Sequence, residues 1–248
     1  MNRIILSIGL LSINLLSNAQ APNFEDLKIL YADAKYEKLV KTAENYANKP
    51  ELAEDADPYL YMSMGLYRIS FTSIAEENPN FADARSAAFD ALGSAMDIDK
   101  NGNDLDKHAA YIDEVQTYLV EAITNEIESA SYTKAANYVK AYGKASKNAK
   151  VGAKLYEGCM KYLKTPDDES SAVTIWEKAQ KMLTKDSLND VSNWTKNDLI
   201  ISKVGLIETL KYLYALENTE MADFFWNYFE VVYGKDEEFM AEYEKAIK

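Results

Sequence analysis

Residues 81–99 read FADARSAAFDALGSAMDID, and this stretch decides the fold because its pattern returns twice further along the chain. The second copy is SYTKAANYVKAYGKASKN at residues 131–148, and the third is SSAVTIWEKAQKMLTKD at residues 170–186. Each copy places Ala seven residues before a small or aromatic residue: Ala84 and Ala91, Ala135 and Tyr142, Ala172 and Ala179. Two helical turns separate such positions, so both lie on one stripe that a neighbouring helix can approach closely. The repeat therefore predicts similar helices stacked side by side.

Helical periodicity continues over the rest of the chain. KYEKLVKTAENY, around Leu39 and Tyr46, is an earlier copy of the pattern, and EMADFFWNYFEVVYG, with Ala222 and Phe229, is a later one. No alternating run of strand type bounded by turn dipeptides is found in the sequence. Periodicity predicts helices over residues 24–48, 58–76, 81–98, 105–129, 132–148, 152–163, 170–183, 196–217, 220–233 and 236–246. Their joints are short, which predicts antiparallel neighbours in chain order and a single domain over residues 20–248.

These patterns resemble the tetratricopeptide repeat family, whose second helix carries Ala, an aromatic residue and Ala at similar spacings. The family's first helix carries a Gly between aromatic residues, which YLYMSMGLY at residues 59–67 matches with Gly65, and Gly158 and Gly205 match more weakly. The copies begin at intervals of 45, 51, 37 and 50 residues, counted from Leu39, Ala84, Ala135, Ala172 and Ala222. The family period is about 34 residues. The resemblance covers most of the chain and implies an all-α, right-handed solenoid of about five stacked helical hairpins with a C-terminal capping helix.

The first 19 residues have the order of a signal peptide. Arg3 precedes an apolar run over residues 4–16, and small residues follow at Ser17 and Ala19. This order predicts export, cleavage after Ala19 and a mature chain that begins at Gln20. The apolar run is too short to span a bilayer, so no membrane insertion is predicted. We expect the protein in the periplasm of a two-membrane bacterium or, alternatively, outside the cell.

The chain is strongly acidic, with a formal net charge of −13. A surface with this balance repels phosphate backbones and anionic lipid heads, so nucleic acid is not an expected partner. A single cysteine, Cys159, cannot form an internal disulfide, and its helical surroundings predict a small buried apolar residue.

The stretch AMDIDKNGNDLDKH at residues 95–108 has two possible interpretations, a calcium-binding loop and a joint between two helices. Four residues match positions one, three, five and six of an EF-hand calcium loop: Asp97, Asp99, Asn101 and Gly102. Position twelve, however, is His108 where the loop needs a bidentate Glu. The reading that we favour is structural: Gly102 ends one helix, and Asn103 or Asp104 caps the next. A weak calcium site at Asp97, Asp99 and Asn101 is the alternative, and no other metal and no cofactor is expected.

No catalytic constellation is visible in the sequence. His108 is the only histidine, and we interpret it as a solvated loop residue, since a nucleophilic site needs a positioned base and orienting group. Paired carboxylates such as Glu76–Glu77 fall at predicted helix ends, where acids are expected for electrostatic reasons. We therefore do not expect an enzyme.

The high aromatic content is the feature that points to a function. The chain has 18 Tyr and 3 Trp, which can fill a core or anchor an interface. The resemblance implies a scaffold that holds a protein or peptide partner on the concave face formed by the first helices. Carried over to the best-matching hairpin, it implies contacts at Tyr59, Met62 and Ile69. The alternative is a glycan-binding or small-molecule-binding protein with an aromatic-lined groove.

FFWNYFEVVY at residues 224–233 is apolar almost all round a helix. Two interpretations stay open. The last helix can cover this surface through Phe239, Met240, Tyr243 and Ile247, since a terminal repeat normally has a polar outer face. Alternatively, Phe225 and Trp226 belong to an exposed patch that a partner or a second copy covers.

Overall fold

The computed structural model describes residues 24–99, 105–183 and 194–246. Within these ranges the regular elements are twelve α-helices and three short 3-10 helices, and no strand is found among them. The prediction of an all-helical chain is confirmed for this part of the sequence. The predicted signal peptide and Asn101 lie outside the described residues.

The α-helices follow one another with short joints. Their bounds are α1 Glu25–Ala32, α2 Tyr36–Ala47, α3 Asp57–Ile69, α4 Ile74–Glu77, α5 Ala84–Ile98, α6 Ala109–Glu128, α7 Tyr132–Lys144, α8 Lys150–Lys164, α9 Glu169–Met182, α10 Lys196–Ala215, α11 Thr219–Tyr233 and α12 Glu237–Ala246. The 3-10 helices are η1 Pro50–Leu52, η2 Pro79–Phe81 and η3 Asp106–His108.

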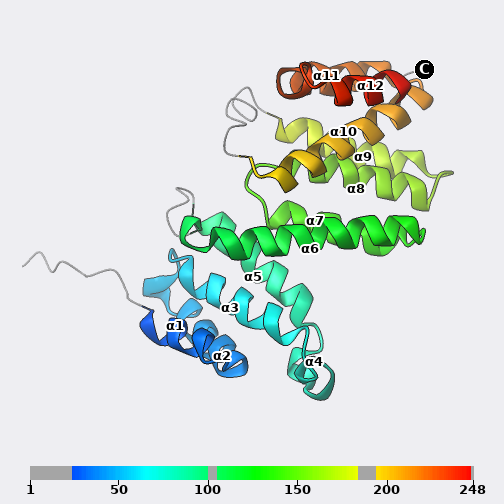
Figure 1. Cartoon of the computed structure of the whole chain (residues 1–248). Helices are drawn as coiled ribbons and strands as arrows, with labels where there is room; N and C mark the ends of the chain where they lie inside the picture. Colours follow the sequence, from blue (N-terminus) through cyan, green and yellow to red (C-terminus); the bar gives the residue numbers. More distant parts are fainter. Residues whose placement is uncertain (1–23, 100–104, 184–193, 247–248) are drawn as a thin grey trace, which may run out of the picture.

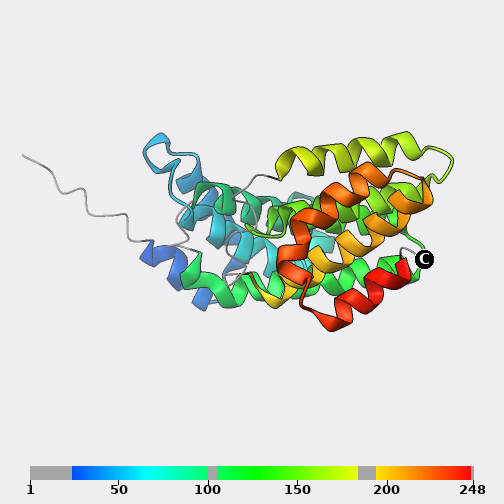
Figure 2. The same cartoon turned by 90° about the horizontal axis from the view of Figure 1, so that it is seen from above.

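Helices that follow one another in the chain pack together. α3 packs against α2 and α5, α7 against α6 and α8, and α8 against α9 and α10, while α10 also contacts α11 and α12. The order in space therefore follows the sequence, from α1 and α2 at one end to α11 and α12 at the other (Figure 1). Seen from above, α9 and α12 lie at opposite edges of the molecule (Figure 2).

Two predicted helices are each divided in the structure. The predicted helix 24–48 is α1 and α2, separated by a turn in which Ala34 has a φ of 54°. The predicted helix 58–76 ends at Ile69, and the chain resumes as the single turn α4. Neither break contains Gly or Pro, which is why periodicity alone missed both.

The same turn closes three helices. Ala34, Ala130 and Glu217 follow α1, α6 and α10, and each has a positive φ of 54–57°. The amide after each of them donates to a carbonyl five residues earlier: Lys35 to Leu30, Ser131 to Glu126 and Asn218 to Leu213, at 2.7–2.9 Å. This is the Schellman geometry, which satisfies carbonyls left free at a helix end. Each turn sends the chain directly into the next helix, α2, α7 or α11.

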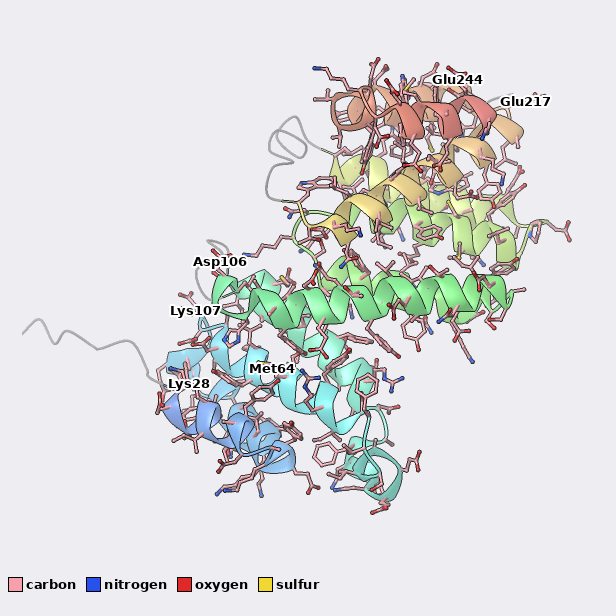
Figure 3. The ribbon with its side chains drawn as sticks, in the orientation of Figure 1. Lys28, Met64, Asp106, Lys107, Glu217 and Glu244 are labelled. Atoms are coloured by element: carbon pink, nitrogen blue, oxygen red, sulfur yellow. The ribbon has the colours of Figure 1, made fainter. Side chains whose placement is uncertain are left out.

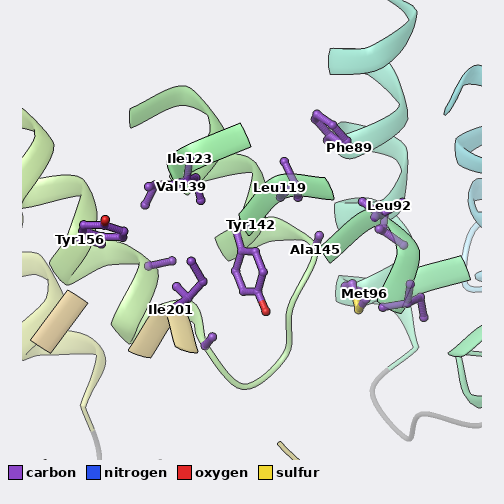
Figure 4. Packing of buried hydrophobic residues seen from close by; sticks show 14 of the residues in the cluster. Phe89, Leu92, Met96, Leu119, Ile123, Val139, Tyr142, Ala145, Tyr156 and Ile201 are labelled. Carbon is purple, nitrogen blue, oxygen red and sulfur yellow. The ribbon is translucent and has the colours of Figure 1, made fainter. Parts of the chain in front are cut away.

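The repeated sequence positions lie in the core. Of the ten residues on the predicted stripes, nine are buried: Leu39, Ala84, Ala91, Ala135, Tyr142, Ala172, Ala179, Ala222 and Phe229. Tyr46 is partly buried and packs against them. Figure 4 shows this core between α5 and α10, including Leu92, Leu119 and Tyr142. Cys159 is fully buried, as predicted.

Charged side chains cover the outer surface. Lys28, Asp106 and Lys107 are exposed around the N-terminal helices, and Glu217 and Glu244 are exposed at the other end (Figure 3). Met64, by contrast, is 6% exposed and belongs to the core beneath α3.

The backbones of α8 and α10 approach each other closely at two glycines. A Cβ on Gly205 would collide with the carbonyl oxygen of Gly152, and a Cβ on Gly152 would lie 2.5 Å from Ser202 Oγ and in collision with its Cα. Glycine at these two positions therefore sets the separation of the two helices. Gly65 and Gly158 also lie at contacts, against Val40 and Trp176.

We expect Gly205→Ala to destabilise the protein by about 1–3 kcal/mol, the usual cost of overpacking. This loss should exceed the gain of up to about 1 kcal/mol that alanine brings to a helix interior. Urea unfolding would measure the difference. Gly143→Ala is the control, because its Cβ would meet only the Ala153 methyl at 3.2 Å. Equal stabilities of the two variants would contradict the close approach.

Candidate functional site

Three of the predicted partner-binding residues lie on α3. Tyr59 and Met62 are half-buried and pack against the core. Ile69 is fully buried, so a partner could not reach it without opening the core. The position taken from the family pattern faces inward here because α3 packs between α2 and α5.

The other two predicted residues lie on α11, and Trp226 contacts α12. Phe225 is fully buried, so it serves the core and not a surface. Trp226 is half-buried and stacks on Tyr243 with ring centroids 4.1 Å apart, and on Phe239 at 6.0 Å. Phe239 is itself fully buried. These contacts favour the lid interpretation of α12, while Ile247 lies outside the described residues.

The carboxylates of the calcium-like stretch have partners within the chain. Asp97 pairs with Lys150 Nζ at 2.9 Å, and Asp99 Oδ2 accepts the backbone N–H of Leu105 at 2.9 Å. Lys147 also donates to the backbone carbonyl of Asp99. In the part of the chain that the structure describes, no group of three His, Cys, Asp or Glu side chains could hold a metal ion. Gly102, Asn103 and Asp104, on which the structural interpretation rests, lie outside the described residues, so the structural interpretation and the calcium alternative both stay predictions.

His108 is not the solvated loop residue that we expected. Its ring packs edge-on against Tyr61, with centroids 5.3 Å apart, and its Nε2 lies 3.7 Å from Asp57 Oδ1. Its side chain is only 14% exposed. His108 therefore helps to join the start of α6 to the start of α3.

The most distinctive surface feature is a cluster of aromatic rings around Tyr118 on α6. Four rings lie with their centroids 5.8–6.4 Å from that of Tyr118: Tyr67, Phe71, Phe89 and Tyr138. They come from α3, the segment after it, α5 and α7. Phe71 is 53% exposed, so the aromatic cluster reaches the surface.

Arg85 of α5 lies against the exposed part of the aromatic cluster. Its guanidinium carbon is 4.6 Å from the Phe71 centroid and 5.3 Å from the Tyr118 centroid. Arg85 Nη1 donates to the Tyr118 hydroxyl at 2.8 Å, and Nη2 donates to the Ser70 carbonyl at 3.0 Å. A cation held over aromatic faces in this way is attracted by their quadrupoles and keeps a fixed orientation. Phe71 and Arg85 thus present a rigid cationic and aromatic surface.

A second arginine supports the cluster from α3. Arg68 donates two parallel hydrogen bonds to the Glu114 carboxylate of α6, both at 2.7 Å. These bonds raise the pKa of the Arg68 guanidinium above its usual range, with burial opposing them. The bidentate pair fixes α3 against α6 and so positions Tyr67 beside Tyr118.

A shallow groove of about 630 Å³ runs beside the cluster, between α5 and α7. It is lined by Ala82, Asp83, Arg85, Ser86, Phe89, Asp90, Lys134, Asn137, Tyr138, Lys140, Ala141 and Lys144. Arg85, Phe89 and Tyr138 belong both to this groove and to the aromatic surface described above. The arrangement offers aromatic faces, a fixed guanidinium and flexible ammonium groups to a bound molecule.

A local lysine-rich stretch in the sequence indicates this groove, although the net charge of the whole chain is negative. Residues 129–156 include six lysines and no acidic residue, in a chain with a net charge of −13. The lysines are Lys134, Lys140, Lys144, Lys147, Lys150 and Lys154. The contribution of Phe71, in contrast, depends on contacts between separate helices, which periodicity does not reveal.

Comparisons with known proteins find no matching family model, no matching curated protein and no matching solved structure. Within the described ranges, no helix has the length and apolar character needed to cross a membrane.

Alkaline pH should weaken the aromatic cluster. Burial, followed by the neighbouring Glu114 carboxylate, raises the pKa of Tyr67 to about 12. The unfolded chain releases this proton near the ordinary value of about 10, so the native state holds more protons between these pH values. The stabilisation that the protonated Tyr67 gives to the folded state is therefore complete below pH ~10 and is lost as pH rises towards ~12. Urea unfolding in this range should show a smaller loss of stability for Tyr67→Phe than for the unmodified protein, and equal losses would contradict the account.

Proposed function

We propose that this chain is an exported protein-interaction module whose docking surface is the groove between α5 and α7 with the adjoining Phe71 and Arg85. The observation that carries the proposal is Phe71, 53% exposed beside a guanidinium that Tyr118 and Ser70 hold in place. Aromatic and arginine side chains in fixed positions are the residues that dominate protein interfaces. A partner that covers Phe71 would remove its exposed ring from water.

We infer that the scaffold is a solenoid of helical hairpins, similar to tetratricopeptide repeats. Three observations support this inference. The pairs α1–α2, α6–α7 and α10–α11 are joined by the same turn, with a positive φ at Ala34, Ala130 and Glu217. The repeated positions are buried in α5, α7, α9 and α11, and in α2 Leu39 is buried while Tyr46 is partly buried. The first helices of successive hairpins also contact each other, since Arg68 of α3 donates hydrogen bonds to Glu114 of α6.

A protein partner fits the groove better than a glycan does. A glycan site would place Trp or Tyr with Asn and Asp in a deep pocket, and the groove carries Tyr138, Asn137, Asp83 and Asp90 on an open, shallow surface. None of the three tryptophans lines the groove: Trp176 is fully buried, Trp226 stacks under α12, and Trp194 lies just before α10. The groove is open, and its walls are the exposed faces of two helices. The only histidine of the chain packs against Tyr61 and does not line the groove. We therefore propose binding and not catalysis.

Capture from the envelope fraction of the native host tests the proposal. The unmodified protein, Phe71→Ala and Ile29→Ala would be used as baits after each is shown to melt cooperatively. Ile29 on α1 is the matched control because it is also 53% exposed and apolar. We expect one protein to be retained by the unmodified chain and by Ile29→Ala but lost with Phe71→Ala.

Retention of the same proteins by all three baits would contradict a docking role for Phe71. Retention of a polysaccharide in place of a protein, again lost with Phe71→Ala, would favour the glycan alternative.

A further inference from the structure

We propose that a basic band across α5, α7 and α8 binds an acidic segment of the partner protein. The basic band consists of Arg85, Lys134, Lys140, Lys144, Lys150 and Lys154. This inference rests on the proposed function, because it names the chemistry of the partner that the groove receives.

The basic band is a continuous surface formed by two adjoining grooves. The groove between α5 and α7 has a neighbour of about 330 Å³ that is lined mainly by α7 and α8. Lys140 and Lys144 line both grooves. Lys134 and Arg85 lie in the first groove, and Lys150 and Lys154 lie in the second. A segment that follows α7 could therefore contact all six cations.

The charge of the band is opposite to that of the whole molecule. The acidic residues that line the two grooves are Asp83, Asp90, Asp97 and Glu157, against the six basic residues of the band. The chain as a whole has a net charge of −13. A local cationic surface attracts an anionic segment, while the acidic remainder of the surface repels other copies of the protein.

Lys134, Lys144 and Lys150 hold carboxylates through contacts weak enough to be exchanged, whereas Lys140 and Lys154 both pair with the buried Glu157, at 3.4 and 2.5 Å. Lys144 pairs with Asp90 at 2.6 Å, with side chains 57% and 60% exposed, and Lys150 pairs with Asp97 at 2.9 Å, 41% and 73% exposed. Exposed pairs of this kind contribute little to stability, so a lysine can turn to an incoming carboxylate without disturbing the fold. Lys134 is freer still, since it is 70% exposed and 4.0 Å from Glu126.

Apolar side chains lie between the cations. Tyr138 and Ala141, both half-buried, line the first groove, and Met182, 38% exposed, lines the second, where Val139 and Ala153 are buried beneath the surface. A polymer that carries only charge would leave this apolar surface in water. An acidic segment that also carries apolar side chains would satisfy both kinds of contact, so a protein segment fits the band better than a nucleic acid or a sulfated glycan.

Fluorescence anisotropy with a labelled peptide composed of Glu, Ala and Leu would test the proposal. A matched peptide with Lys in place of Glu is the probe for charge, and single-stranded DNA and dextran sulfate are the rival polyanions. We expect only the Glu peptide to bind well, and increasing salt should weaken its binding because charges carry part of the affinity.

Two double variants with the same change in net charge locate the site. Lys134→Glu with Lys144→Glu alters the band, and Lys38→Glu with Lys41→Glu alters exposed positions on α2. Each would first be shown to melt like the unmodified protein. We expect the band variant to bind the Glu peptide at least ~10-fold more weakly, because like charges then face each other, and the α2 variant to bind it as before.

Equal binding by the two double variants would overturn the proposal, and so would equal binding of the Lys peptide. Tighter binding of DNA or dextran sulfate than of the Glu peptide would show that the anion class is wrong. If the band variant still captures the partner that Phe71→Ala loses, the acidic-segment inference fails and the proposed function stands. If Phe71→Ala also keeps every captured protein, both fail.

Discussion

Replacing Asp198 with alanine should destabilise the protein by about 3 kcal/mol or more, because it removes the acceptor of a buried network. Asp198 is 1% exposed. Its Oδ1 accepts hydrogen bonds from the Tyr142 hydroxyl at 3.0 Å and from the Ser146 hydroxyl at 2.6 Å. Without the carboxylate, both donors would be left in the core, and each buried unsatisfied donor costs about 1–3 kcal/mol.

The same side chain begins α10. Asp198 Oδ2 accepts the backbone N–H of Thr195 at 3.2 Å, while the Thr195 hydroxyl accepts the backbone N–H of Asp198 at 3.0 Å. This reciprocal capping box fixes the N-terminus of α10. Burial and the Asp198 carboxylate also raise the pKa of Tyr142, so the phenol remains a donor at neutral pH. One residue thereby joins α7 to α10.

Urea unfolding of Asp198→Ala beside Asp223→Ala would measure the effect. Asp223 is the matched control, since it accepts from the Tyr214 hydroxyl at 3.2 Å but is exposed. We expect the control to lose only a few tenths of a kcal/mol, the usual effect of a surface change. Similar losses for both variants would show that the buried network does not hold α7 and α10 together.

Ending the chain at Gly234 should cost about 3 kcal/mol and cause self-association. The truncation removes Phe239, which is fully buried, and Tyr243, which stacks on Trp226. Loss of one buried phenylalanine side chain alone typically costs about 3–5 kcal/mol. The ring of Trp226 and the core beneath α12 would then face water, and exposed apolar patches of this kind promote association.

Thermal melting and sedimentation of the full chain and the truncated chain would test this lid account. Phe239→Ala in the full chain is the control, because it removes the buried ring and keeps Tyr243 over Trp226. We expect the full chain to be monomeric, Phe239→Ala to be less stable and the truncated chain to associate. Self-association of the full chain that Trp226→Ala weakens would favour the interpretation of α11 as a docking surface.

Periodicity predicted most helices within a few residues. The predicted helix 220–233 is α11, and the predicted helix 132–148 begins where α7 begins. Periodicity did not predict the helix break at Ala34. Alanine favours helices, yet at this position it takes a positive φ to end α1, because the following α2 must fold back against its neighbours. Tertiary packing, not local preference, sets this break.

The candidate site was less predictable than the fold. Ile69 was predicted to contact a partner, and Phe225 belonged to a docking patch in one of the two interpretations of residues 224–233. Both are fully buried, because sequence position does not tell which side of a helix a neighbour covers. The contact of Arg85 with Phe71 and Tyr118 joins three separate segments and leaves no local pattern. The lysines of residues 129–156 were readable, since an acid-free stretch in so acidic a chain is visible without a structure.

Photocrosslinking in the native host tests the central claim most directly. A photoreactive phenylalanine analogue would replace Phe71 in one strain and Ile29 in another, two apolar positions that are each 53% exposed. The account predicts that position 71 forms a covalent adduct with one protein that carries an acidic segment and that position 29 forms none. No protein adduct from position 71, or the same adduct from both positions, would contradict it.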